Sequence, residues 1–227
     1  MITRELILQE ARRWVGYTES DRRSLAEYDS QKGGGGKKNF NRFSFIFDRL
    51  LDPKTYAGGT KDGLAWCAAF VTTCIGTSTF ERKDGLCVAI AADNDRITLG
   101  REMVANLSAA LGLQGSTQHQ LARASLLAGV SSFPKFTAVQ PCTLSEVESA
   151  DLVIFGGNAH IGFVESVGDG TFTTIEGNTS VGANSDGGAV CRKTYRPIGS
   201  ILAEVRGSVE FKSWRSYKFY KLKIQYK

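Results

Sequence analysis

The chain of 227 residues is long enough for one domain with a sizeable core, and its composition is that of an ordinary globular protein. It contains no run of about 18 to 20 apolar residues, which excludes a membrane-spanning helix, and its charged start shows no secretory signal. We therefore expect synthesis in the cytoplasm, with any action outside depending on release by other means. The net charge of +5 favours anionic partners.

Cysteine and histidine usage argues against disulfides and metals. The chain has five cysteines and two histidines. An odd count leaves at least one thiol unpaired, and a chain without an export signal is not expected to form a disulfide framework. No cysteine pair has Cys-x-x-Cys spacing, and neither histidine has a suitable neighbour one helical turn away. We expect no metal ion and no other cofactor.

The first third of the chain predicts helices joined by loops. Apolar residues recur at helical spacing over residues 6–14 and again over residues 41–51. The glycine-rich stretch 32–38 predicts a flexible surface loop. A turn-rich stretch, 58–63, then leads to Cys67, where an apolar helix is expected to begin.

The middle of the chain, about residues 81–146, has a mostly helical pattern and is expected to be an insertion. Amphipathic spacing predicts helices over 97–113 and 118–127. His119 lies in the second of these helices among polar neighbours, which favours a surface position over a catalytic one.

The pattern changes at Asp151 to short β-branched and aromatic runs separated by glycine. These runs predict antiparallel strands in the tail and at 151–155, 161–167, 171–175 and 189–195. Helices followed by strands predict an α+β fold, with N-terminal helices packed on a C-terminal antiparallel β-sheet.

Residues 1–210 are expected to form the single domain, and the segment 211–227 that follows is basic and aromatic. Three interpretations compete for this segment: nucleic-acid binding, attraction to an anionic cell surface, and a last strand with a solvated basic face. The alternation of apolar residues from Tyr217 to Tyr226 favours the strand, and we expect no nucleic-acid or membrane partner. A positive field would still attract anionic wall polymers.

Cys67 is the candidate nucleophile. Turn residues precede it and an apolar helix follows it, and the start of a helix favours the reactive thiolate over the thiol. A thiol on an apolar helix is also a common core residue, and Cys74 on the same helix illustrates that alternative. The assignment of Cys67 therefore needs support from elsewhere in the chain.

That support comes from a predicted hairpin. We expect Val167 to pair with Thr171 across a three-residue loop, and counting back along the ladder places His160 opposite Asn178. A two-residue loop would shift the register by one and turn His160 to the other face. The functional hypothesis therefore requires a loop of odd length.

In the same register Gly162 lies opposite Glu176, which brings Glu176 diagonally within reach of His160. Gly162 is expected to leave open space beside the imidazole. We expect this glycine, together with Trp66 beside the nucleophile, to bind substrate.

These residues have the chemistry of a cysteine hydrolase. Cys67 would attack as the nucleophile, and His160 would take its proton and later protonate the leaving amine. Glu176 would hold the imidazole and stabilise its protonated form. Asn178 would either help in this or lie in the oxyanion pocket.

Several segments resemble the CHAP family, the cysteine- and histidine-dependent amidohydrolases/peptidases that cleave peptidoglycan, among them bacteriophage lysins (endolysins). The resemblance covers about residues 5–80 and 150–200 and is most specific from His160 to Asn178. The similar segments are Val15–Glu19, Gly63–Val71, Asp151–Phe155, His160–Val164, Thr173–Ser180 and Gly187–Lys193.

The resemblance implies a papain-like α+β fold and a catalytic set of Cys67, His160, Glu176 and Asn178. It implies bacterial peptidoglycan as the partner and the bacterial cell wall as the place of action. The bond cleaved would be the N-acetylmuramoyl-L-alanine amide or a stem or cross-bridge peptide bond. Some relatives carry an acidic calcium loop before the cysteine, whereas here only Asp62 stands there, so calcium is not expected. We expect a monomer.

Two other functions remain open. The same catalytic groups would serve a toxin or effector amidase or protease that acts on another substrate. A hydrolase-like scaffold could also have become an inactive wall-binding virion module.

Overall fold

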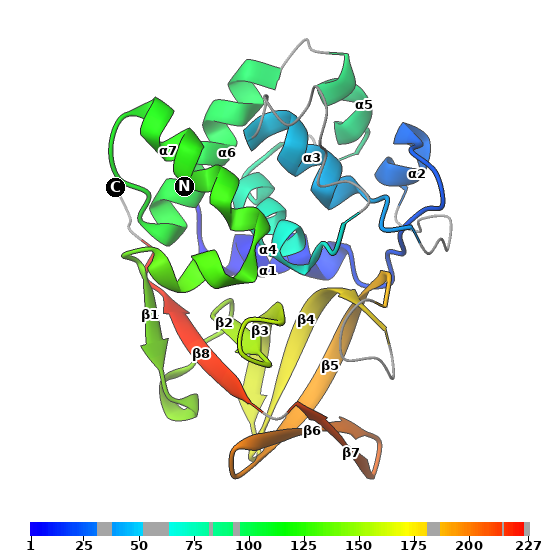
Figure 1. Ribbon diagram of the computed structural model, residues 1–227, viewed down its shortest axis with the longest axis vertical. Helices are drawn as coiled ribbons and strands as arrows, with labels where there is room; N and C mark the ends of the chain where they lie inside the picture. The colour runs from blue at the N-terminus through cyan, green and yellow to red at the C-terminus, as the bar shows by residue number, and fades with distance from the viewer. Residues whose placement is uncertain are drawn as a thin grey trace.

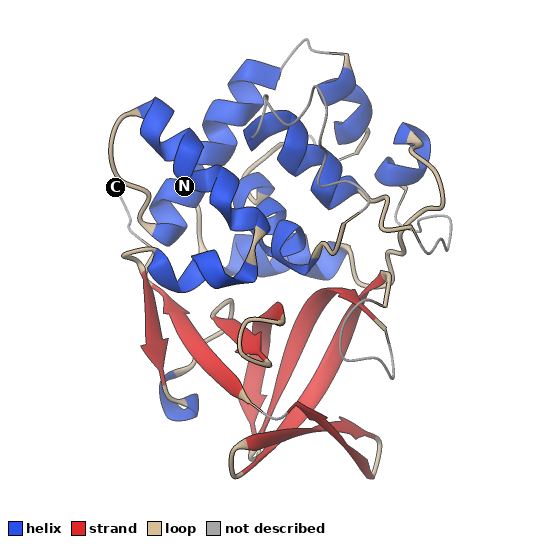
Figure 2. Cartoon of the chain, in the orientation of Figure 1, coloured by secondary structure: helices blue, strands red, loops and turns tan. Residues whose placement is uncertain are grey.

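The computed structural model describes residues 1–30, 38–51, 64–81, 84–92, 96–180, 187–214 and 216–224. Helices fill the N-terminal part of these residues and strands the C-terminal part, so the chain is a mixed helix-and-sheet protein (Figures 1 and 2). This agrees with the α+β class expected from the sequence. The predicted turn at 58–63, and the predicted loop at 32–38 apart from Lys38, lie outside the described residues.

The helical layer lies above the sheet in Figure 1. The helices predicted over 6–14, 41–51, 97–113 and 118–127 correspond to α1, α3, α6 and α7. The α-helices are α1 (Arg4–Arg13), α2 (Leu25–Asp29), α3 (Arg42–Leu51), α4 (Cys67–Thr77), α5 (Leu86–Ala91), α6 (Arg96–Leu111) and α7 (Thr117–Ala124). Short 3-10 helices follow: η2 (Ser125–Ala128), η3 (Val130–Lys135) and η4 (Leu144–Glu146).

The strands form one antiparallel sheet in the order β1-β8-β2-β3-β4-β5-β6-β7. The last strand of the chain lies between β1 and β2, while β6 and β7 cross the far end of the sheet in Figure 1. The strands are β1 (Val139–Cys142), β2 (Leu152–Phe155), β3 (His160–Gly168), β4 (Thr171–Thr179), β5 (Ala189–Ile198), β6 (Ile201–Arg206), β7 (Val209–Trp214) and β8 (Tyr217–Leu222).

Helix α4 is the centre of the molecule, and every one of its residues is buried. It packs against α1, α3 and α6 on one side and against β3 and β4 on the other. Its threonines are tolerated inside because their hydroxyls donate to backbone carbonyls, Thr72 to Leu127 at 2.9 Å and Thr73 to Phe43 at 3.1 Å. Because α4 packs against other elements along its length, the position of its first residue, Cys67, is fixed by the core.

The sheet carries a different apolar cluster on each face. Leu152 and Ile154 of β2 join the large core beneath the helices. Val153 and Phe155, which alternate with them, join a second cluster that includes Leu202 and other residues of β3 to β8. The second cluster is buried by the strands themselves, because β6 and β7 turn over this face. Its other members are Val164, Phe172, Tyr195, Trp214 and Phe219.

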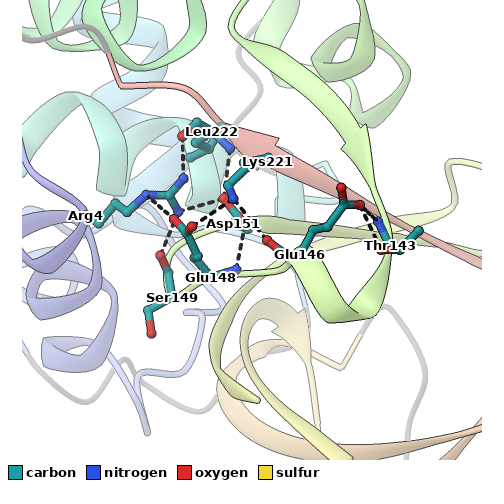
Figure 3. Close-up of polar contacts among 8 residues, drawn as sticks. All are labelled: Arg4, Thr143, Glu146, Glu148, Ser149, Asp151, Lys221 and Leu222. Atoms are coloured by element: carbon teal, nitrogen blue, oxygen red, sulfur yellow. Dashed lines mark hydrogen bonds and ion pairs between the residues drawn. The ribbon is translucent and has the colours of Figure 1, made fainter.

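A buried carboxylate ties the first helix to the last strand (Figure 3). Asp151, immediately before β2, is fully buried and accepts hydrogen bonds from Arg4 Nη1 at 2.6 Å and from the backbone N–H of Leu222 at 2.9 Å. Nearby, Lys221 of β8 donates to Glu148 at 2.8 Å, and this hydrogen bond lowers the pKa of Glu148. These contacts position β8 in the middle of the sheet.

Candidate active site

The structure places Cys67 at the first position of α4, as the sequence predicted. The side chain of the preceding residue, Trp66, does not cap the helix, so it satisfies none of the first-turn N–H groups. The positive end of the helix dipole favours negative charge there. Cys67 is 6% exposed, in contrast to Cys74, which is completely buried in the core.

Trp66 fixes the start of this helix from inside the core. Its ring stacks on Phe43 with 5.4 Å between ring centroids, and its indole Nε1 donates to Glu19 Oε2 at 3.1 Å. The side chain has no exposed surface. This differs from the substrate-binding role expected for Trp66: the indole is a structural support for the segment that carries Cys67.

The hairpin that carries His160 has a two-residue turn, so the predicted odd loop length is wrong. Gly168 pairs with Thr171, and the turn residues Asp169 and Gly170 both have positive φ angles, 52° and 70°. This is the geometry expected of an Asp-Gly hairpin turn.

A β-bulge compensates for the short turn. Val164 pairs with Thr174 and Ser166 with the adjacent Thr173, which leaves Glu165 as an extra residue on β3. Beyond the bulge Phe163 pairs with Ile175. Continuing this count gives the register expected for His160 and Glu176, because the odd residue lies in the strand instead of in the loop.

His160 and Glu176 form a fully buried pair. The Nε2 atom of His160 lies 2.9 Å from Oε2 of Glu176. The other carboxylate oxygen, Oε1, accepts a hydrogen bond from the hydroxyl of Thr174 at 2.5 Å. With both oxygens engaged, the carboxylate has one orientation and fixes that of the imidazole.

The thiol of Cys67 interacts with His160, which also contacts Glu176. Burial by itself would lower the pKa of His160, but interactions with the Cys67 thiol and the Glu176 carboxylate outweigh it and raise the pKa to about 9. Since Nε2 is engaged by Glu176, Nδ1 is the nitrogen left for the thiol. Nδ1 is buried and makes no hydrogen bond within the described residues. The contact with Cys67 is therefore looser than a standard hydrogen bond, as is common before substrate binds.

The pKa of Glu176 moves in the opposite direction. Its burial would raise the pKa, yet the hydrogen bond from His160 and the positive charges of His160 and Lys193 lower it overall. A carboxylate beside an imidazolium is thus the stable arrangement in this pair at neutral pH.

Asn178 lies near the end of β4 with a positive φ of 56°. It is 2% exposed, and its Oδ1 atom has no hydrogen-bond partner within the described part of the chain. Glu176, and not Asn178, therefore bonds to the imidazole here. The buried, unpaired amide oxygen leaves Asn178 able to bind a group that arrives with substrate.

Two glycines allow these elements to approach. A Cβ on Gly162 would lie 2.7 Å from Cγ of Glu176, so the space beside this glycine is filled by the Glu176 side chain and is not open to substrate, contrary to expectation. A Cβ on Gly177 would lie 2.5 Å from Cβ of Phe70 and 2.9 Å from Trp66. Only glycine lets β4 pass so close to the start of α4.

Sequence reasoning missed the groups that enclose the pair. The indole of Trp214 stacks on the imidazole of His160, with ring centroids 5.8 Å apart and planes inclined by 10°. Tyr195 of β5 lies in the same apolar cluster. The aromatic character of the last strands was visible in the sequence, but no local pattern indicated that β7 returns to the histidine.

Other groups lie away from this site. His119 is exposed on α7, as expected. Asp62 falls outside the described residues. Among the residues that the structure describes, no cluster of three or more histidine, cysteine, aspartate or glutamate side chains could hold a metal ion.

Comparisons of the chain with protein-family models, with curated proteins and with solved structures found no match. In the described part of the chain, no helix has both the length and the apolar character needed to cross a membrane.

Proposed function

We propose that this chain is a cysteine-dependent hydrolase that cleaves amide bonds of bacterial peptidoglycan. The observation that carries the proposal is the line Cys67, His160, Glu176, with the 2.9 Å contact between the last two. These three residues correspond to a thiol nucleophile, its acid–base partner and the carboxylate that orients the acid–base partner.

In the reaction, His160 already carries the proton given up by the Cys67 thiol, and the thiolate sulfur attacks the carbonyl carbon of the amide. The tetrahedral intermediate collapses as His160 protonates the leaving amine, which breaks the C–N bond and leaves a thioester on Cys67. Water then attacks the thioester, giving up a proton to His160, and the thiol is regenerated with release of the carboxylic acid.

The buried pair of His160 and Glu176 has the properties that these reaction steps require. Glu176 favours the protonated ring, and the pKa of about 9 keeps His160 ready to act as an acid at neutral pH. The unpaired Oδ1 of Asn178 marks its amide as a further polar group close to the nucleophile segment. Its Nδ2 would supply a donor to the developing oxyanion if the amide rotates.

The substrate class rests on the similarity of the nucleophile, histidine and Glu/Asn segments to the CHAP family. A helix that bears the cysteine and packs on an antiparallel sheet with the histidine is compatible with a papain-like CHAP fold. The positive net charge would favour approach to anionic wall polymers. We propose the bacterial cell wall as the site of action.

Purified bacterial walls provide the test. Wild-type protein should reduce the turbidity of a wall suspension, and Cys67→Ala should not, while Cys74→Ala should retain activity because Cys74 lies in the core away from the site. Mass analysis of the fragments separates an amidase, which frees the L-alanine amine from the lactyl group, from an endopeptidase, which frees an amine within the peptide.

Two results would reject the proposal. Wall binding without fragment release, equal for wild type and Cys67→Ala, would indicate a binding module. Thiol-dependent cleavage of other amides with intact walls would indicate a hydrolase of another substrate.

A further inference from the structure

Tyr195 and Trp214 close the rear of the His160–Glu176 pair. They come from β5 and β7 and belong to the second apolar cluster. Trp214 stacks on His160 and also on Phe155, with 5.1 Å between the second pair of centroids. The ring centroids of Tyr195 and the same phenylalanine are 5.4 Å apart.

Both aromatic residues bring a buried polar atom without a hydrogen bond. Tyr195 Oη and Trp214 Nε1 have no hydrogen-bond partner among the described residues. Leaving a buried hydroxyl and a buried indole N–H unpaired is costly, and a phenylalanine at either position would avoid the cost. The polar atoms therefore need an explanation beyond packing.

The position of Glu176 supplies one. Phe172 pairs with Tyr195 and Glu176 with Cys191, so Tyr195 and Glu176 share one face of the β4–β5 ladder. The pKa of Tyr195 is raised, first by burial and then by the charge of Glu176 and a side-chain interaction with it. Trp214 interacts with the same hydroxyl. Phenol oxygen, carboxylate and indole N–H thus lie together behind the histidine.

We propose that Tyr195 is a positioning residue for catalysis: its hydroxyl, oriented by the indole N–H of Trp214, donates to Glu176 and shares that carboxylate with His160. The inference rests on the proposed function for its role in turnover, but its geometry does not depend on the substrate. In the free protein the hydroxyl makes no standard hydrogen bond to the described residues, yet it interacts with Glu176 and with Trp214.

Several charged groups surround this hydroxyl. Glu176 faces His160 and Lys193, and Tyr195 faces Glu176, Glu204 and Arg206. On the other side of the imidazole lies the thiol of Cys67. Tyr195→Phe removes one neutral donor and changes none of these charges. An altered titration of His160 would therefore report the lost interaction of the hydroxyl with Glu176.

The test is an NMR titration of the two histidines in the whole protein. Exposed His119 serves as an internal reference. Without the tyrosine hydroxyl, Glu176 accepts more strongly from His160, so the imidazolium is held more tightly. We expect Tyr195→Phe to raise the pKa of His160 by about 0.5 to 1 unit.

A second variant and a control sharpen the result. Trp214→Phe keeps an aromatic ring against His160 but removes the indole N–H, and we expect a smaller shift in the same direction. The double variant should shift no more than Tyr195→Phe alone, because both changes act through one hydroxyl. Tyr217→Phe removes a hydroxyl from a ring that packs on Phe219, and should leave the titration of His160 unchanged.

In turnover of wall fragments, Tyr195→Phe should lower kcat about tenfold with little change in KM. A pKa of His160 that is unmoved or lowered in Tyr195→Phe overturns the inference, provided that circular dichroism shows a folded protein. Wild-type protein that leaves walls intact would reject the proposed function alone, since the NMR shift still decides the role of Tyr195.

Discussion

His160 and Glu176 meet at 2.9 Å although the turn between their strands, taken by itself, would place them on opposite faces of the sheet. The conflict is resolved by Glu165, which lies between Val164 and Ser166 and has no partner residue on β4. A one-residue shift in a strand reverses which face every side chain occupies. The bulge thus decides whether the imidazole and the carboxylate share a face.

Deleting Glu165 tests this account of the hairpin. Its neighbours already pair with the adjacent residues Thr174 and Thr173, so a chain without Glu165 forms a regular ladder that keeps His160 facing Glu176. The variant loses the ion pairs of Glu165 with Arg12 at 2.8 Å and Arg192 at 2.6 Å. We expect about 1 kcal/mol less stability, because the arginines are partly exposed. In NMR, His160 should still titrate near pH 9. A return to the ordinary value would contradict this register.

Wild-type activity should depend on pH through His160. The acid form of the ring is needed to protonate the leaving amine, so kcat should fall as pH rises through about 9. Rate measurements on wall fragments from about pH 6 to pH 10 would show this limb. A fall centred near the ordinary histidine value would disagree with the buried pair.

The same titration affects stability. The folded pKa of about 9 lies above the ordinary value of 6.5, so protonated His160 stabilises the fold fully below about pH 6.5. That contribution is lost as the pH rises through 9. Denaturant unfolding of wild type should therefore show a decline over this range that His160→Gln lacks. If the unfolding free energies of the two proteins depend on pH in the same way, His160 makes no such contribution to stability.

Glu176→Gln should reverse the shift at His160. The amide keeps the shape of the side chain but removes the negative charge that favours the imidazolium. We expect the pKa of His160 to fall by at least about 1 unit and kcat at neutral pH to fall at least about tenfold. NMR and rate measurements on one sample would check both. Glu148→Gln, on the surface near β8, is the matched control and should change neither.

Gly177→Ala should separate β4 from α4. The new methyl group would lie 2.5 Å from Cβ of Phe70, too close for either element to stay in place. Overpacking of this kind costs about 1 to 3 kcal/mol, and the displaced carboxylate strand should reduce kcat further. Thermal unfolding and turnover are the measurements. Gly168→Ala, where a methyl group meets nothing within 4 Å, should be close to wild type.

Asp151→Asn should weaken the link between α1, β2 and β8. The amide would keep the shape of the side chain but leave Arg4 without its buried counter-charge (Figure 3). We expect a loss of about 2 to 3 kcal/mol in denaturant unfolding, less than for a fully buried pair because Arg4 reaches the surface. Glu146→Gln, at an exposed capping position, should cost less than about 1 kcal/mol. Equal losses in both variants would argue against this role for Asp151.

The sequence by itself determined the order of helices and strands and the position of Cys67 at a helix start. Helical spacing and the change to glycine-separated β-branched runs are local signals, and they persist in the structure as α1, α4 and β2 to β5. The pairing of His160 with Glu176 was predicted in the correct register but from a wrong loop length, because the bulge at Glu165 offsets the two-residue turn.

Tertiary structure decided how the register of the β3–β4 hairpin arises. It also decided which residues enclose His160 and Glu176. In the sequence Glu165 looks like any other strand residue, and the arginines that it contacts in the structure, Arg12 and Arg192, come from distant elements. Trp66 was expected to bind substrate, yet its ring stacks on Phe43 and its indole N–H donates to Glu19 inside the core. Trp214 reaches His160 only because β7 folds over the sheet, and a contact made by long-range folding leaves no pattern in the residues around it.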